Sequence, residues 1–205
     1  MRELLPGIYH WTARHPKIKQ EVSSYYFEPE RVLIDPILPE EGVSWFVGHV
    51  ERPAHVLLTN RHHYRDSDAF VDAFGCEVHV HRAGLHEFKG KRRKRVVAFD
   101  PGDTLPGGVE ALGIDVLCPD ESALLVHREG GIVCLADAVI RDGEGPMAFV
   151  PDALLGDDPQ AIKDGLQQRF RDLVVARSFQ HVLLAHGAPW IDGGSIALNR
   201  FAGGL

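Results

Sequence analysis

The stretch LLTNRHHYRDS, Leu57–Ser67, ends a short apolar run and then gathers two histidines, two arginines, a tyrosine and an aspartate within a few residues. The preceding segment AHVLLT (54–59) predicts a buried strand, because aliphatic residues fill a short run that polar residues bound. Polar side chains directly after a buried strand sit on a rigid backbone and can face a cleft. The loop Asn60–Asp66 is therefore the first candidate for a functional site.

Short strands and helices are predicted on both sides of this loop. The first half predicts strands at 7–13, 23–28, 31–36, 54–59 and 76–81 and helices at 40–50 and 67–75. The second half predicts strands at 95–99, 109–114, 123–127, 131–136 and 180–187 and helices at 158–176 and 195–201. The helix at 158–176 is apolar along one stripe only, so it should cover one face of a sheet. Two strand-rich halves with outer helices predict an α/β (α+β), four-layer αββα sandwich in a single domain, residues 1–205.

Composition limits the classes of partner. The 205 residues are 44% hydrophobic and 25% charged and carry a formal charge of -7, which disfavours binding to nucleic acid or to anionic membranes. The basic run KRRKR (91–95) is interpreted as a solvated connection rather than as a phosphate or RNA patch. Three cysteines indicate no disulfide framework, and no segment suits a signal peptide or a membrane span. We therefore expect a cytoplasmic protein whose partner is a small molecule.

Four groups of polar residues follow predicted strands directly. They are the loop Asn60–Asp66, the turn LCPDES (117–122), Asp137 after GIVCLA, and His186 after QHVLL. Their convergence at one edge of a two-sheet sandwich would assemble a zinc site from distant parts of the sequence. His79 and His81, which share one face of the strand at 76–81, are interpreted as surface residues instead.

In this arrangement the chain resembles the metallo-β-lactamase superfamily. RVLIDP (31–36) resembles the family's early strand that ends in aspartate, and LLTNRHHYRDSDA falls where the family has a threonine followed by H-x-H-x-D-H. FDPGDTLPGGVEALGI is similar to the strand pair before the family's G-H-T-P-G-S turn, which LCPDES replaces. GGIVCLADAVI and HVLLAHGAP resemble the strands that deliver the bridging aspartate and the last histidine. The order is kept along nearly the whole chain.

The resemblance implies a degenerate metal motif. With Thr59 as the anchor, Asn60 stands at the first histidine position, His62 at the second, Tyr64 at the aspartate position and Arg65 at the third histidine position. A register shifted by two residues would match His62 and Asp66 instead. In the replaced turn, Cys118 stands where a histidine ligand is expected, while Asp137 and His186 match the family's pattern.

The resemblance leaves two functions open. In the first, a mononuclear hydrolase of ester, thioester or amide bonds holds one zinc, iron or manganese ion. Its metal ligands would be His62, Cys118, Asp137 and His186, its catalytic residues Asp137, Tyr64 and Arg65, and its cleft lining Asn60, Arg61, His63 and Asp66. In the second, a metal-free pseudoenzyme binds a small anionic metabolite or a partner protein through Arg61, Arg65 and His186.

Two further expectations concern Arg65 and the quaternary structure. Arg65 should point inward and pair with Asp137, so that its charge excludes a second metal ion. The apolar segment FVPDALLG (149–156) could form a lid over the cleft or a contact in a homodimer.

Overall fold

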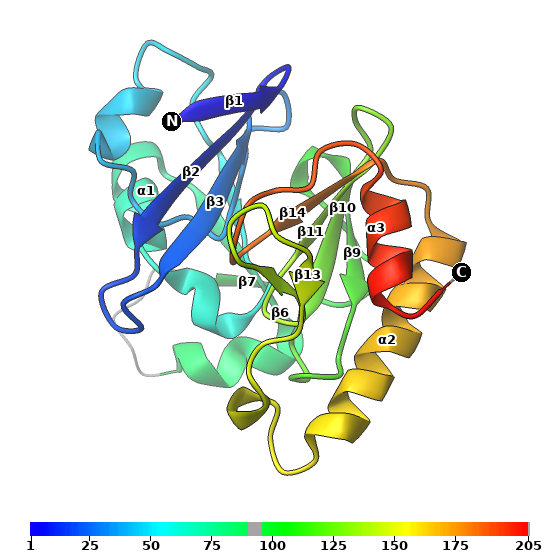
Figure 1. Cartoon of the computed structure of the whole chain (residues 1–205). Coiled ribbons are helices and arrows are strands. Elements are labelled where there is room, and N and C mark those ends of the chain that lie inside the picture. The colour runs from blue at the N-terminus through cyan, green and yellow to red at the C-terminus, as the bar shows by residue number, and fades with distance from the viewer. Residues whose placement is uncertain (90–95, 205) are drawn as a thin grey trace.

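The computed structural model describes residues 1–89 and 96–204, in which two β-sheets pack face to face with helices on their outer sides (Figure 1). The predicted four-layer αββα sandwich is confirmed. The basic run at 91–95 lies outside the described residues, so its interpretation stays a prediction.

The first half of the chain builds the larger sheet. Its strands follow chain order: β1 (Arg2–Leu5), β2 (Ile8–Arg14), β3 (Glu21–Phe27), β4 (Val32–Ile34), β5 (His55–Leu57), β6 (Glu77–His81) and β7 (Val96–Phe99). The pairs from β1 to β4 are antiparallel, whereas those from β4 to β7 are parallel. The carboxyl ends of β4 to β7 therefore open on the same edge of the sheet.

The second half builds the smaller sheet, in the order β14-β11-β10-β9-β8. Its strands are β8 (Thr104–Leu105), β9 (Val109–Gly113), β10 (Ser122–Val126), β11 (Ile132–Leu135) and β14 (His181–Leu184). Only β11 and β14 are parallel, and their carboxyl ends lead into Asp137 and His186. A separate hairpin, β12 (Ile140–Arg141) with β13 (Met147–Ala148), follows Asp137.

Three apolar clusters hold the four layers together. One lies between the sheets and includes Leu57 of β5 and Leu183 of β14. A second joins the outer face of the larger sheet to α1 (Ser67–Phe74) through residues such as Phe70. The third joins the smaller sheet to α2 (Pro159–Ala176) and α3 (Gly194–Phe201), with Phe170 buried at its centre. Burial of these side chains supplies the main favourable term of folding.

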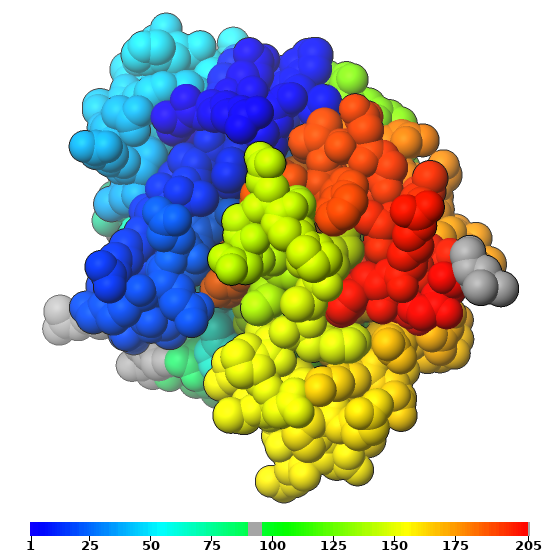
Figure 2. Space-filling model, in the orientation of Figure 1, coloured from blue at the N-terminus to red at the C-terminus, as the bar shows by residue number. Residues whose placement is uncertain are grey.

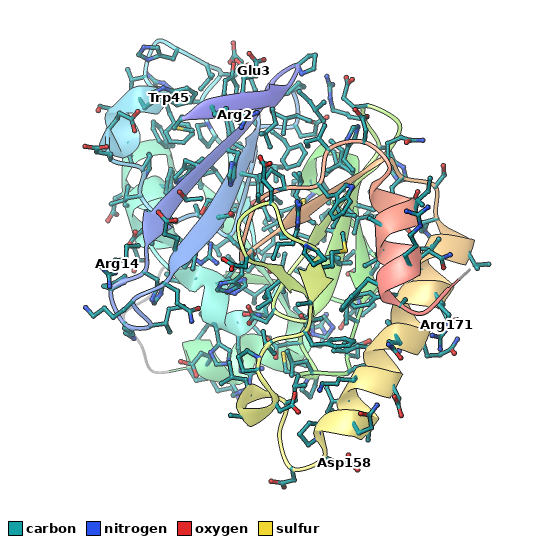
Figure 3. All side chains as sticks on the ribbon, in the orientation of Figure 1. Arg2, Glu3, Arg14, Trp45, Asp158 and Arg171 are labelled. Atoms are coloured by element: carbon teal, nitrogen blue, oxygen red, sulfur yellow. The ribbon has the colours of Figure 1, made fainter. Side chains whose placement is uncertain are left out.

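The helices confirm the predicted pattern at 67–75, 158–176 and 195–201. Asp158 caps α2 by accepting a hydrogen bond from the backbone N–H of Ala161 at 3.0 Å, and it lies at the end of the helix in Figure 3. The helix predicted at 40–50 is wrong: a 3₁₀ helix, η1 (Gly42–Phe46), occupies part of that range. Its backbone leaves the helical region at Val47, and the buried ring of Phe46 fixes the turn against α1.

The segment at 149–156 lies on the surface in the lower part of Figure 2, next to the first turns of α2, where Lys163 forms an ion pair with Asp152 at 2.6 Å. It contains the 3₁₀ helix η5 (Asp152–Leu154), and Phe149 packs against Phe201 of α3 with ring centroids 4.6 Å apart. Its role as a lid or dimer contact stays a prediction. No helix in residues 1–89 and 96–204 is long and apolar enough to cross a membrane.

Candidate metal centre

Three donor side chains meet where strands of both sheets end. His63 lies in the 3₁₀ turn η2 (Arg61–Tyr64) that follows β5, Asp137 follows β11, and His186 follows β14. Nε2 of His63 lies 3.1 Å from Oδ1 of Asp137, and Nε2 of His186 lies 3.0 Å from the same oxygen. The two imidazole rings are 5.9 Å apart between centroids. One side chain from the larger sheet and two from the smaller sheet thus converge on a single point.

Buried neighbours fix two of these three side chains. Nδ1 of His63 lies 2.9 Å from Oδ2 of Asp35, which follows β4. The carboxylate of Asp35 also accepts hydrogen bonds from the backbone N–H of Thr59, at 2.8 Å, and from its hydroxyl, at 2.5 Å. Nδ2 of Asn60 donates to Oδ2 of Asp137 at 2.8 Å. The remaining oxygen of Asp137 is therefore the one that faces both histidines.

The electrostatics of the cluster are tightly coupled. Burial alone would lower the pKa of His63, but the charges of Asp137 and Asp35 raise it to about 9. Burial alone would raise the pKa of Asp137, but the charge of His63 and the hydrogen bonds of His186 and His63 hold it well below its usual value. Without a bound ion, His63 is thus a positively charged imidazolium that lies between the carboxylates of Asp35 and Asp137.

The three donor side chains differ in their exposure to solvent. The side chains of Asp137 and His186 are 28% and 17% exposed, whereas that of His63 is 5% exposed. A small molecule can therefore reach the side of Asp137 and His186, while His63 closes the rear of the site.

The predicted ligand His62 is not part of this cluster, and His63, predicted only to line the cleft, takes its place. The cause is local: the side chain of Asn60 accepts a hydrogen bond from the backbone N–H of His62, at 2.8 Å, and caps the 3₁₀ turn. The turn buries His63 and leaves His62 exposed. Partial burial, followed by the charge of Arg61, lowers the pKa of His62.

Tyr64 and Asp66 also lie apart from the donor atoms. Tyr64 is buried in the cluster under α1, and its hydroxyl donates to Asp68 at 2.6 Å, so it is not placed to stabilise an oxyanion. Oδ2 of Asp66 accepts a hydrogen bond from the backbone N–H of Leu38 at 2.8 Å. Both residues stabilise the turn instead.

Arg65 points inward, as predicted, but the predicted ion pair with Asp137 is not formed. Its Nη1 donates to the backbone carbonyls of Ser23, at 2.6 Å, and Asp35, at 2.7 Å. The positive φ of Arg65, 42°, turns its side chain back toward β3 and β4, where these carbonyls lie. Its charge still acts on both Asp35 and Asp137.

The turn at 117–122 supplies a partner that holds Arg61 in place rather than a metal ligand. The guanidinium of Arg61 forms an ion pair with Asp120, whose other oxygen accepts from the backbone N–H of Arg61 at 2.7 Å. The sulfur of Cys118 does not belong to the cluster of donor atoms, and burial raises the pKa of its thiol to about 12. The carboxylic acid of Glu121, which the sequence did not single out, is fully buried and accepts from the backbone N–H of Ala138 at 2.6 Å.

A close backbone approach holds His186 in place. Its carbonyl accepts a hydrogen bond from the N–H of Arg141 in the β12–β13 hairpin at 3.1 Å. Gly187 has φ 96°, and a Cβ there would lie 2.2 Å from the carbonyl oxygen of Arg141. Nη1 of Arg141 also donates to the carbonyls of Ala188 and Pro189, both at 3.0 Å. Only glycine fits after this histidine.

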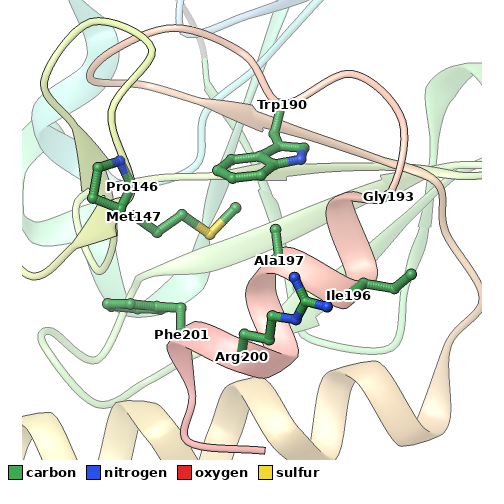
Figure 4. Close-up of a pocket in the computed structure, with 8 residues that line it drawn as sticks. All are labelled: Pro146, Met147, Trp190, Gly193, Ile196, Ala197, Arg200 and Phe201. Atoms are coloured by element: carbon green, nitrogen blue, oxygen red, sulfur yellow. The ribbon is translucent and has the colours of Figure 1, made fainter. Parts of the chain in front are cut away.

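A cavity of about 540 Å³ lies beyond this loop and does not include the three donor residues. Trp190 lies on one side of it and Phe201 and Arg200 of α3 on the other, with Met147 between them (Figure 4). The donor cluster and this cavity are thus separate features of the molecule.

The donor cluster suits a metal ion. Ligand atoms around a tetrahedral zinc ion are about 3.3–3.5 Å apart, given metal–ligand distances of about 2.0–2.1 Å. The three donor atoms lie within 4.8 Å of one another, and two of the three spacings are 3.0 and 3.1 Å. Two imidazoles and a carboxylate are a donor set of both catalytic zinc and non-haem iron. The contact from Asp35 to His63 is the usual support of a histidine ligand.

Comparisons with known proteins identify the fold. No family model and no curated protein matches the sequence. Among solved structures, the di-iron-bound form of TTHA1623 matches with a TM-score of 0.66 and 23% identity over 93% of this chain and 99% of that one. DIM-1 metallo-β-lactamase matches with 0.69 and 14% identity, over 98% of this chain and 95% of its own. The flavodiiron protein from Giardia intestinalis matches with 0.68 and 16% identity over 98% of this chain, which spans 58% of that protein. The chain has the metallo-β-lactamase fold.

Proposed function

We propose that the chain is a mononuclear metal-dependent hydrolase of ester, thioester or amide bonds, with His63, Asp137 and His186 as metal ligands. The observation that carries the proposal is the convergence of Nε2 of both histidines on Oδ1 of Asp137, at 3.1 and 3.0 Å. Three protein ligands leave one position open, as in catalytic zinc sites. When bound, the ion would polarise a substrate carbonyl and lower the pKa of a bound water toward 7.

The protein's own groups prepare this site. With an ion bound, Asp35 would keep the proton of His63 on Nδ1, so that Nε2 could give its lone pair to the metal. Asn60 occupies one oxygen of Asp137 and thereby directs the other toward the histidines. The imidazole of His62 is exposed and interacts electrostatically with Asp137 and His63, so it is the candidate for a contact with the substrate.

The charge of Arg65 supports a single ion. Its guanidinium lies behind Asp35 and acts electrostatically on Asp35 and Asp137. A divalent ion 4 Å from such a charge is repelled by about 8 kcal/mol at an effective dielectric constant of 20. A second ion beside Arg65 is therefore disfavoured.

The metal-free binding protein is the second candidate, and the raised pKa of His63, about 9, is the observation in its favour. Its imidazolium could hold the two carboxylates together without an ion. Anion binding, however, requires free arginines, and Arg61 is paired with Asp120 while Arg65 is bonded to the carbonyls of Ser23 and Asp35. The hydrolase is therefore the better supported of the two.

The adjacent histidines provide a matched test. We expect His63→Ala and His186→Ala each to lower the metal content of protein purified without chelator by about one equivalent per chain, measured by plasma mass spectrometry. His62→Ala should keep that equivalent, because its side chain is exposed and lies outside the donor cluster. Loss of metal from the His62 variant alone would show that the sequence-derived register is right and this assignment wrong.

Activity gives the second readout. Hydrolysis of p-nitrophenyl acetate should disappear on removal of metal, return on addition of zinc, iron or manganese, and be absent in His186→Ala. His62→Ala should raise KM with a smaller change in kcat, since it leaves the ligands in place. A wild-type chain that carries no metal and hydrolyses nothing, yet folds cooperatively, would favour the metal-free candidate.

A further inference from the structure

A second set of donor atoms lies at the opposite edge of the larger sheet. His55 begins β5, and Glu77 and His79 lie in the neighbouring parallel strand β6. The register pairs His55 with Glu77 and Leu57 with His79, so the three side chains stand on one face of two adjacent strands. This group is at the amino ends of these strands, whereas His63 follows their carboxyl ends.

The distances between the donor atoms suit a metal ion. Nε2 of His79 lies 3.4 Å from Nδ1 of His55, which is the spacing of two ligands around tetrahedral zinc, about 3.3–3.5 Å. Oε2 of Glu77 lies 3.8 Å from His55 and 3.9 Å from His79. The side chain of Glu77 is 62% exposed, so it can move the few tenths of an ångström that coordination needs.

One side chain of this group is buried and the other two are more exposed. The side chain of His79 is 8% exposed and that of His55 is 26% exposed. Burial lowers the pKa of both imidazoles, that of His79 to about 4, so both rings are neutral near pH 7. In the metal-free protein one proton lies between the two nitrogens that face each other at 3.4 Å, Nε2 of His79 and Nδ1 of His55. The same two nitrogens are available to an ion.

We propose that His55, Glu77 and His79 form a second transition-metal site that takes Zn²⁺, with a water as the fourth ligand. It is separate from the candidate catalytic centre: five residues of extended chain from His55 to Asn60 correspond to about 16 Å. The ion would join β5 to β6 at their amino ends, beside the hydrogen bond from the backbone N–H of Glu77 to the carbonyl of Ala54 at 3.1 Å, so its role is to stabilise the sheet that carries the catalytic turn.

A variant that lacks the catalytic ligand isolates this site. Metal-free His186→Ala is titrated with Zn²⁺ in competition with a chromogenic zinc chelator, and one equivalent is expected to bind. His186→Ala/His79→Ala should bind none, and His186→Ala/Glu77→Gln should bind at least about tenfold more weakly. His186→Ala/His127→Ala is the matched control, because the side chain of His127 is 61% exposed and lies outside the group, and it should bind as His186→Ala does.

The thermal midpoint of His186→Ala should rise with Zn²⁺ concentration, and that of the His79 double variant should not. If His79→Ala fails to fold, His186→Ala/His55→Ala gives the same test, since His55 is more exposed. Unchanged zinc binding in these variants overturns the proposal. If instead wild type and His186→Ala bind the same number of ions and His79→Ala loses one, this site stands and the proposed catalytic site fails.

Discussion

Nδ1 of His63 lies 2.9 Å from Oδ2 of Asp35, and this contact joins the turn after β5 to the end of the neighbouring strand β4. Asp35 has a positive φ, 48°, and its carboxylate also receives both donors of Thr59. Three hydrogen bonds thus hold one buried carboxylate behind the imidazole. The ring of His63 consequently has a single orientation, with Nε2 toward Asp137.

We expect Asp35→Asn to weaken metal binding by about 10–100-fold, the usual effect of losing the partner of a histidine ligand. The amide can still accept from Thr59 but can present its NH₂ group to His63, which favours the wrong ring tautomer. Competition with a chelator measures the affinity. Asp115→Asn, an exposed aspartate with a similar φ of 55°, is the control and should leave the affinity unchanged.

Arg65→Ala should lower the free energy of unfolding by about 2–4 kcal/mol, because hydrogen bonds from a charged donor to two buried carbonyls are lost. The carbonyls of Ser23 and Asp35 would both lose the donor that Arg65 supplies, although that of Asp35 would keep the hydroxyl of Ser24 at 2.7 Å. Urea denaturation measures the change. Arg14→Ala removes an exposed side chain and should lower the free energy of unfolding by less than about 0.5 kcal/mol. Equal effects of the two variants would show that the hydrogen bonds of Arg65 to the two carbonyls do not stabilise the fold.

Gly187→Ala and Gly193→Ala separate backbone strain from close packing. Both glycines have positive φ, 96° and 64°, but only at Gly187 would a Cβ meet another atom, the carbonyl oxygen of Arg141 at 2.2 Å. Gly193→Ala should cost about 1–2 kcal/mol from the left-handed conformation alone. Gly187→Ala should cost clearly more and also reduce metal binding, since the clash moves His186. Similar unfolding midpoints, measured by circular dichroism, would argue against this packing.

Glu121→Gln should change how stability depends on pH. Burial, followed by the charge of Asp137, raises the pKa of Glu121 from 4.5 to about 8. Between these values the folded chain keeps a proton that the unfolded chain has released, so the wild-type free energy of unfolding falls as pH rises from 4.5 to 8 and then levels off.

Glutamine does not titrate, so the stability of Glu121→Gln relative to wild type should increase across this window, at about 1.4 kcal/mol per pKa unit and by a few kcal/mol at most. Urea denaturation at several pH values gives the difference. Titrating groups that do not interact with Glu121 contribute equally to both proteins. Glu129→Gln, an exposed carboxylate, serves as the control, and a flat difference for Glu121→Gln as well would mean that Glu121 is ionised in the folded state.

The sequence placed Asp137 and His186 at strand ends, where the structure has them, and their role as ligands stays a prediction. Asp137 and His186 follow unbroken buried strands, so their positions depend only on the sheet, which alternation and apolar runs reveal. His63 was missed because its orientation depends on a 3₁₀ turn capped by Asn60, which no periodicity marks. A signal was present in Asp35: a buried aspartate after β4 requires hydrogen-bond donors, and Thr59 and His63 supply them.

Two other errors have the same origin. The segment at 40–50 contains two glycines and three valines, which are weak helix formers, and contacts of Phe46 with Phe70 and Tyr26 leave a single 3₁₀ helix in it. His79 and His81 were expected at the surface, yet both are less than 9% exposed, because the inner face of β6 is covered at that point. Local sequence does not show which length of a strand a second sheet will cover.

The division of the chain between the two sheets has a consequence for assembly. The larger sheet is complete at Phe99 and the smaller begins at Thr104, while His63 belongs to one and Asp137 and His186 to the other. Cleavage between Phe99 and Thr104 would therefore yield two fragments, each with a whole sheet and neither with a whole set of donors. An ion that requires all three donors would then act as a reporter of complementation, since it would be retained only when the two fragments reassociate in the native arrangement.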